Sequence, residues 1–217
     1  YGILFFRITS DLVPFASHPV MDFPWQDRFR DRFRELGRTI RETGTRISMH
    51  PDQFILINAP DGSIVGRSIA ELRYHAEVLD LMGLDSTAKI QIHVGGVYGD
   101  REAGIRRFVE RAEGLDHVLL RRLAIENDDL RYPLGDCLRI HDDTGLPVIL
   151  DAFHHELHNR NEPLSQAIAL AAGTWSDTDG IPMADYSSQE KGRKRGTHAA
   201  SRDPEHFRRF LRSTGDQ

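Results

Sequence analysis

Residues 89 to 100 read KIQIHVGGVYGD, and this stretch carries the pattern on which the fold assignment rests. A mostly apolar run ends on His93, and a glycine turn leads toward a helical pattern near residues 101–112. Apolar runs of this length are typical of strands that are buried on both faces of a parallel sheet. We therefore expect a buried parallel strand at 89–94 with His93 near its carboxyl end.

The same alternation recurs along the chain. Five further apolar runs are expected to form strands, at residues 3–9, 46–50, 122–127, 147–153 and 181–188. Helical patterns are found near 25–43, 67–82, 101–112, 134–143, 163–172 and 203–213. Strands that alternate with amphipathic helices predict a parallel sheet with right-handed crossovers.

The first of these helices shows its boundaries clearly. Pro24 suits the first turn of a helix, and Gly44 suits the position just after its end. The face expected to be buried is formed by Phe29, Phe33, Leu36 and Ile40.

Two parallel architectures compete at this point. A dinucleotide-binding sheet would offer the turn GxGxxG, and His93-Val94-Gly95-Gly96 lacks the third glycine. A TIM barrel builds its active site from the carboxyl ends of several strands, which is where the polar residues of this chain lie. The fold class expected is therefore α/β, a TIM (β/α)8-type barrel. Because no linker composition interrupts the sequence, residues 1–217 are expected to form one domain.

Composition limits the classes of protein further. The only cysteine is Cys137, so no internal disulfide can form, and a reducing, cytoplasmic location is expected. No apolar run reaches the length of a membrane span, and the N-terminus does not read as a signal peptide. The net charge of −5 disfavours a protein that coats nucleic acid, although the basic run at 190–195 could meet phosphates. A solvated loop is the simpler interpretation of that run.

Chemistry-bearing side chains gather where the expected strands end. They are Asp11, His18, His50, His93, Glu126, Asp151, His154, Asp185 and His198. Imidazole nitrogens and carboxylate oxygens without thiolates form a ligand set suited to manganese or zinc. The remaining histidines are interpreted as structural or surface residues, with His155 expected to point away from the site.

So many ligands exceed the needs of one ion. Two or three ions a few ångströms apart are the usual means of activating water and stabilising a leaving oxygen in phosphodiester hydrolysis. Sugar isomerases and epimerases on metal-binding barrels compete on equal terms at this point, because they also take histidine and carboxylate ligands from strand ends.

Six stretches taken together resemble the successive motifs of the UV damage endonucleases. They are FFRITSDLVPFASHP, SMHPDQF, IHVGGVYGD, ENDD, DAFHH and the segment from Ser187 to His198. The resemblance runs almost from end to end and in the same order. It implies a TIM barrel, up to three divalent ions with manganese preferred, and incision of DNA immediately 5′ to a pyrimidine photodimer. A further implication is a UV-damaged double-stranded DNA partner, and we expect a monomer when the barrel is complete.

The resemblance also assigns roles to residues. Those that match the family's metal ligands are His18, His50, His93, Glu126, Asp151, His154 and His198. Met183-Ala184-Asp185 departs from the family's Lys-x-His, so Asp185 is an expected ligand while the third ion loses its lysine. Because the family pattern has a strand before Tyr1 and another after Gln217, we expect a barrel fragment that lacks the first and last strands, with an exposed sheet edge on each side.

The resulting expectation is metal-dependent hydrolysis, with Glu126 and Asp151 as bridging or water-orienting acids. Gln53 and Phe54 match a pair with which the family probes the DNA helix at the dimer, although Phe54 could instead pack in the core. Arg7 is expected to hold a phosphate or a carboxylate, or to form a structural ion pair. Further contacts with the DNA backbone are expected from Tyr98, Lys191, Arg193, Lys194 and Arg195. The alternatives are a sugar-phosphate isomerase or epimerase and, more distantly, a non-catalytic damage-binding module.

Overall fold

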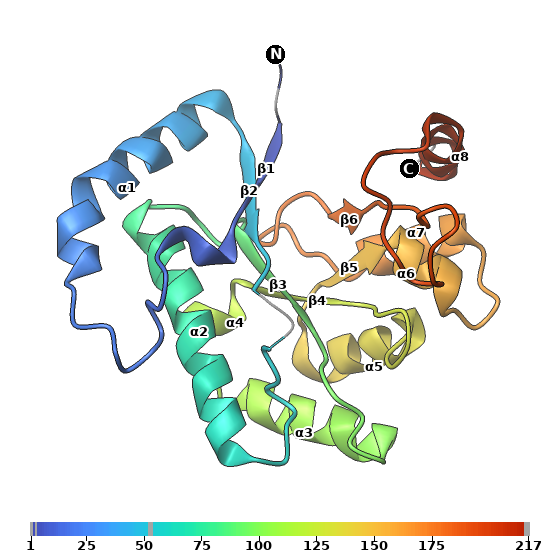
Figure 1. Ribbon diagram of the computed structural model, residues 1–217, viewed down its shortest axis with the longest axis horizontal. Coiled ribbons are helices and arrows are strands. Elements are labelled where there is room, and N and C mark those ends of the chain that lie inside the picture. Colours follow the sequence, from blue (N-terminus) through green and yellow to red (C-terminus); the bar gives the residue numbers. More distant parts are fainter. Residues whose placement is uncertain (1, 3, 52–53, 215–217) are drawn as a thin grey trace.

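The computed structural model describes residues 2, 4–51 and 54–214, and its centre is a curled parallel sheet (Figure 1). Six strands pair in chain order, β1-β2-β3-β4-β5-β6. Their bounds are Phe5–Ile8 (β1), Arg46–Met49 (β2), Lys89–His93 (β3), Leu123–Glu126 (β4), Val148–Asp151 (β5) and Ala184–Asp185 (β6). Consecutive parallel neighbours joined by helices are the pattern of a TIM-type barrel, and the arrangement corresponds to an open part of one.

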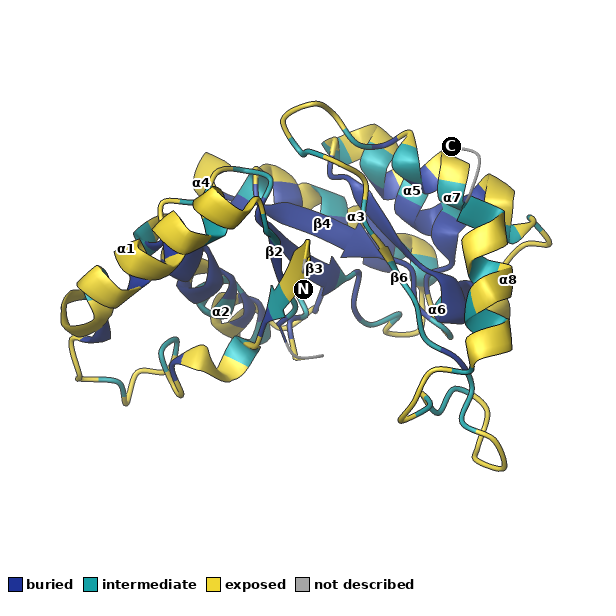
Figure 2. Cartoon of the chain, turned by 90° about the horizontal axis from the view of Figure 1, so that it is seen from above, coloured by how far each residue is buried: buried dark blue, intermediate teal, exposed yellow. Residues whose placement is uncertain are grey.

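Helices surround the outside of this sheet (Figure 1). Their bounds are Trp25–Thr43 (α1), Gly62–Leu81 (α2), Arg101–Glu113 (α3), His117–Leu120 (α4), Leu134–Thr144 (α5), Ala152–Leu157 (α6), Leu164–Ala172 (α7) and Pro204–Thr214 (α8), with a short 3-10 helix at Ser10–Leu12 (η1). Figure 2 shows the central strands as buried, while much of α1 and α8 is exposed. The apolar core therefore lies between the strands and the helices that cover them.

The expected strands and helices are present, with four differences. Helix α2 begins at Gly62, five residues earlier than expected, because the side chain of Asp61 accepts a hydrogen bond from the backbone of Ser63 and caps the helix. The short helices α4 and α6 were not expected. Strand β5 ends at Asp151, so the following residues are helical where a strand was expected. Strand β6 is only two residues long.

The buried face of α1 differs from the expected one. Trp25, Phe33 and Gly37 are buried, whereas Phe29 and Leu36 are 40% and 49% exposed. At Gly37 an added Cβ would lie 1.7 Å from the carbonyl oxygen of Met82. The two segments approach so closely that only glycine fits, and this contact rotates the helix away from the orientation that its large apolar residues suggest.

The inner face of the sheet is polar. Arg7, Ser48 and Lys89 occupy paired positions on β1, β2 and β3, so their side chains lie on the same face. Below the site, Lys89 Nζ lies 2.5 Å from Asp179 Oδ1. Arg46 donates to the carbonyl oxygens of Asp179 and Ile181. The segment that precedes β6 therefore closes the amino-terminal end of the inner space, and the carboxyl ends of the strands stay accessible.

Candidate metal centre

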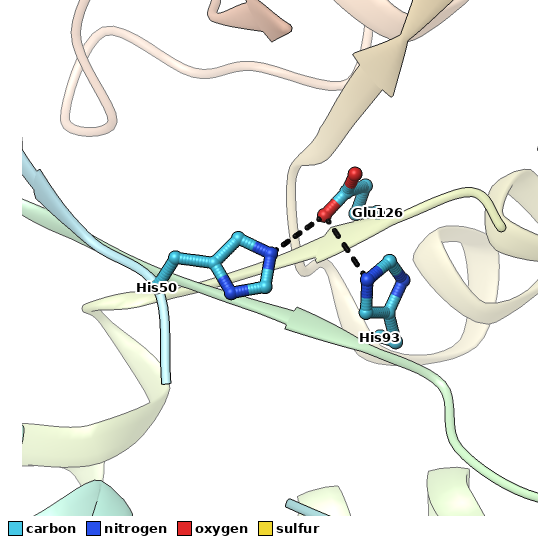
Figure 3. A group of neighbouring side chains, drawn as sticks. All are labelled: His50, His93 and Glu126. Atoms are coloured by element: carbon cyan, nitrogen blue, oxygen red, sulfur yellow. Dashed lines mark hydrogen bonds and ion pairs between the residues drawn. The ribbon is translucent and has the colours of Figure 1, made fainter. Parts of the chain in front are cut away.

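The site is organised around Glu126, the last residue of β4 (Figure 3). Its carboxylate is buried, and histidine rings lie next to it. His50 Nε2 lies 3.1 Å and His93 Nε2 lies 3.6 Å from Glu126 Oε2. His154 Nδ1 lies 3.3 Å from Oε1 of the same carboxylate. One carboxylate therefore contacts three imidazoles.

Strand pairing brings these residues together. His93 and Glu126 are register partners on β3 and β4, and both follow apolar strands whose alternate residues are buried in the core. His50 follows β2 directly, and its Nδ1 lies 2.8 Å from the carbonyl oxygen of Pro51. Because the strands are parallel, their carboxyl ends meet at one edge of the sheet, and the polar side chains at these ends converge.

Asp151 and His154 complete the site from β5 and α6. The carboxylate of Asp151 caps α6 by accepting a 2.8 Å hydrogen bond from the backbone nitrogen of His154. Asn127 links the two strands, because its side chain donates to the carbonyl of Asp151 and accepts from the backbone nitrogen of Asp151. The Nδ1 of His154 lies 3.0 Å from the carbonyl oxygen of Asn127.

Two groups of side chains have ligand geometry. In the first, His50, His93 and Glu126 offer one atom each, and the three atoms lie within 4.8 Å of one another; Glu126, Asp151 and His154 form the second group under the same limit. Both groups combine nitrogen and oxygen donors, which suits manganese, zinc or iron. Since Glu126 belongs to both, its two oxygens could serve two ions.

The charges of this cluster are strongly coupled. Burial raises the pKa of Glu126, but hydrogen bonds with His154 and His50 outweigh it and hold this pKa well below its usual value. Burial, aided by the charge of Glu126 and opposed by His154, raises the pKa of Asp151 to about 7. Burial lowers the pKa of His154, but its hydrogen bond to Glu126 and the charge of Asp151 raise it to about 9. Burial lowers the pKa of His93.

Other expected ligands lie outside these two groups. Asp185 forms a 2.6 Å ion pair with Arg7, so the structure places Arg7 against a carboxylate. His198 is exposed, and its ring centroid lies 5.5 Å from that of His154. His18 is exposed in the loop after η1, where Nδ1 accepts from the backbone nitrogen of Val20. Asp11 is also exposed.

His155 lies outside the two ligand groups, and it is buried and not solvated. It lies on α6 and is 3% exposed, and its Nε2 lies 3.1 Å from the carbonyl oxygen of Glu162. The helical start after Asp151 places it against the protein instead of in solvent.

Among the described residues expected to contact DNA, Phe54 and Tyr98 line the pocket beside the ligand groups. Phe54 is 82% exposed, which contradicts the alternative that it packs in the core. Gln53 lies outside the described residues. Tyr98 adopts a left-handed backbone (φ 51°), and its ring lies 5.6 Å from the guanidinium carbon of Arg107. The basic side chains of Lys191, Arg193, Lys194 and Arg195 are exposed on one loop.

A pocket of about 610 Å³ adjoins the ligand groups. His93 and His154 contribute to its lining, together with Phe54, Tyr98 and Leu130. The sequence did not predict Leu130 as a site residue, and its side chain is 73% exposed. Asp128 holds the turn that carries it by accepting from the backbone nitrogens of Leu130 and Arg131. The pocket therefore joins the ligand cluster to exposed apolar side chains, those of Phe54 and Leu130.

Parallel strands whose carboxyl ends converge on histidines and carboxylates define a class, the TIM-type barrels with a candidate metal site. Within that class the sequence model of the UV-endonuclease UvdE matches residues 1–209. The chain belongs to the UV-endonuclease family.

Individual relatives agree with this assignment. A UV DNA damage endonuclease of Bacillus mycoides (strain KBAB4) is 34% identical over 214 residues, which is 99% of this chain and 68% of that protein. One of Clostridium perfringens (strain 13 / Type A) is 36% identical over 202 residues, which is 92% of this chain. The chain spans about half the length of the Clostridium protein, 49%.

Solved structures show the same fold. The crystal structure of SacUVDE superposes with a TM-score of 0.93 at 43% identity, covering 97% of this chain and 71% of that one. A D-psicose 3-epimerase structure superposes with a TM-score of 0.60 at 13% identity, covering 99% of this chain and 72% of that one. The second likeness shows the barrel fold alone. The expected TIM-type fold class is thus confirmed. In the part of the chain that the structure describes, no helix is both long and apolar enough to cross a membrane.

Proposed function

We propose that this chain carries the metal centre of an endonuclease that hydrolyses the phosphodiester immediately 5′ to a UV photoproduct in double-stranded DNA. The observation that carries the proposal is the carboxylate of Glu126, which belongs to two ligand groups at once. Membership of the UV-endonuclease family supports the same activity.

The residues that would hold divalent ions are His50, His93 and Glu126 for one ion and Glu126, Asp151 and His154 for another. We propose manganese, which the resemblance to the UV damage endonucleases implies and with which imidazole and carboxylate donors are compatible. Bound divalent ions supply an activated water and neutralise charge on the phosphoryl oxygens. A third ion would draw on His198 and His18, and the proposal leaves Asp185 out of the ligand set.

The side chains of the chain have separate tasks in this proposal. Glu126, with its depressed pKa, supplies a permanent negative charge at the centre of the cluster. Asp151 would hold an ion together with Glu126 and His154, and its carboxylate would orient the water bound there.

Recognition of damage would fall to the exposed rim of the pocket. Phe54 can stack on bases that a bent duplex exposes, and Gln53 is proposed to hydrogen-bond their partners. Photodimers distort the duplex already, so unstacking costs least at the lesion. Tyr98, Arg193 and Lys194, which are exposed, would contact the phosphate backbone.

Lys191 and Arg195 already have protein partners. Lys191 Nζ lies 3.6 Å from Asp203 Oδ2, and Arg195 donates to the carbonyl of Leu157. Contact with phosphate would therefore compete with these bonds, and we propose a weaker role for both residues.

The proposal is tested by the nicking of supercoiled plasmid, irradiated or not, in the presence of Mn²⁺. We expect the purified protein to nick irradiated plasmid only and Glu126→Gln to abolish nicking, because the change removes the shared charge. Glu42→Gln, an exposed change on α1, is the matched control and should nick normally. Turnover of a ketose sugar without nicking would instead support the epimerase alternative. A binding module would be supported if the unaltered protein bound irradiated DNA without nicking it and if Glu126→Gln bound it equally well.

We propose that the enzyme with a complete barrel is a monomer in the cytoplasm, where it has access to DNA. The single cysteine is buried, which is compatible with a reducing compartment. Analytical ultracentrifugation at micromolar concentration tests the monomer, and a dimer at this concentration would refute it.

A further inference from the structure

Gln91 lies on β3, two residues before His93, and is fully buried. Its side chain faces the polar interior of the curled sheet, where it lies below the ligand groups. A buried glutamine needs partners for both its amide hydrogens and its carbonyl oxygen, because an unpaired polar group in the interior is costly.

All the polar atoms of this side chain are engaged. Gln91 Nε2 donates to Glu126 Oε2 at 2.7 Å and to Asp185 Oδ2 at 2.5 Å. Gln91 Oε1 accepts a 2.9 Å bond from Arg7 Nη2. The same guanidinium nitrogen donates to Asp185 Oδ1 at 2.6 Å. These bonds form a closed ring of Arg7, Asp185 and Gln91, from which one amide hydrogen is directed at Glu126.

The ring fixes the orientation of the amide. If Gln91 were flipped, its oxygen would face two carboxylates and its nitrogen would face a guanidinium, so every contact would become repulsive. The charge of Arg7 also offsets that of Asp185, which lies on the last strand of the sheet. The first, third and last strands together therefore direct a donor at Glu126.

We propose that Gln91 is the positioning residue of the metal centre, and that Arg7 and Asp185 act on the metals through it. This inference rests on the function proposed above. The histidines that face Glu126 offer nitrogens that would turn to an ion, whereas an amide N–H cannot be given up to a metal. The hydrogen bond from Gln91 to Glu126 therefore remains when ions bind, and this bond holds Oε2 of the shared carboxylate in place. Asp185 then serves as a partner of Gln91 and Arg7 and not as a ligand.

Mn²⁺ titration by calorimetry, without DNA, provides the first test. Partners that orient a metal ligand typically change metal affinity by about 10- to 100-fold when they are removed. We expect Gln91→Met to weaken Mn²⁺ binding by this factor without reducing the number of ions bound. Ser48→Ala is the matched control, because Ser48 is fully buried on the same face of the neighbouring strand. Its hydroxyl bonds to none of the described residues, so its affinity should equal that of the unaltered protein.

A double-mutant cycle separates positioning from ligation. If Asp185 acts through Gln91, then Asp185→Asn weakens Mn²⁺ binding in the unaltered protein but has little further effect in the Gln91→Met background. The inference would be overturned if Asp185→Asn removed one bound ion or weakened Mn²⁺ binding equally in both backgrounds, because either result would show that Asp185 is a ligand.

Two further measurements keep the test decisive. Should thermal unfolding show that Gln91→Met does not fold, Gln91→Asn decides, because its shorter amide keeps the polar character but cannot reach Glu126. Unchanged affinity in a folded Gln91 variant overturns the inference. Glu126→Gln serves as the reference: if this change leaves Mn²⁺ binding intact, the metal centre itself is misassigned, and the proposed function fails independently of Gln91.

Discussion

Binding of Mn²⁺ should release protons from the cluster, and the number released should depend on pH. His154 has a pKa of about 9, so in the metal-free protein its ring is protonated at pH 7. An ion can bind the ring only after that proton leaves. Asp151, with a pKa of about 7, is about half protonated at the same pH. Mn²⁺ therefore competes with protons for both side chains.

The size of the effect follows from these values. At pH 7, about 2 units below the pKa of His154, displacing the proton from this ring costs roughly 2.7 kcal/mol of metal-binding free energy, or about 100-fold in Mn²⁺ affinity. Between pH 7.5 and 8.5 about one proton should be released, mainly from His154. At pH 6 at least about two should be released, because Asp151 is then protonated as well. Affinity should accordingly rise as the pH rises from 6 to 8.5.

Calorimetric titration of Mn²⁺ in buffers of different ionisation enthalpy counts these protons directly. His206→Gln is the matched control, because His206 also pairs with a glutamate, at 3.0 Å from Glu156, but lies outside the ligand groups. It should release the same number of protons as the unaltered protein. A heat of binding independent of the buffer at pH 7 would refute the argument, since it would mean that no proton leaves when the metal binds.

Three further predictions concern recognition and stability. Gln53→Ala combined with Phe54→Ala should weaken binding to dimer-containing duplex by about 5- to 150-fold, the loss expected for about 1–3 kcal/mol of stacking, with much less effect on undamaged duplex. Fluorescence anisotropy measures both, and an equal loss on the two DNAs would contradict a probing role. Gly37→Ala should destabilise the protein by about 3 kcal/mol or more in urea unfolding, because the new Cβ meets the Met82 carbonyl; an exposed glycine change, Gly62→Ala, should cost far less. The metal-free protein should lose stability between pH 5 and 9. Folding raises the pKa of Asp151 to about 7 and that of His154 to about 9, so the folded state favours the protonated form of each group. The stability that each group contributes is lost as the pH rises through its folded pKa. Saturating Mn²⁺ at 100 times its Kd should restore about 2.7 kcal/mol, and a stability independent of pH would contradict the assignment.

Much of the fold could be predicted from the sequence because each buried strand is a short apolar run with its own helix. The end of such a run is visible locally, so His50, His93, Glu126 and Asp151 could be placed at strand ends without any coordinates. Helix boundaries were predictable where a local signal existed, as at Gly44, which adopts the left-handed conformation after α1. The buried face of α1 was not, because it depends on how closely another segment approaches Gly37.

By itself, the sequence determined the class of fold, the edge of the sheet that carries the chemistry and the types of ligand available there. Only the tertiary structure decided which of these side chains meet. Strand register and sheet curvature set those distances, and both depend on contacts between residues far apart in the chain. Asp185 lies at a strand end, and the curl of the sheet brings it to Arg7, 178 positions away, a pairing that the sequence does not reveal. Gln91 read as part of an apolar run, although the alternation of Lys89, Gln91 and His93 was the available signal for a polar inner face. Its contact with Glu126 depends on the packing of two neighbouring strands, and the identity of the two residues alone cannot encode it.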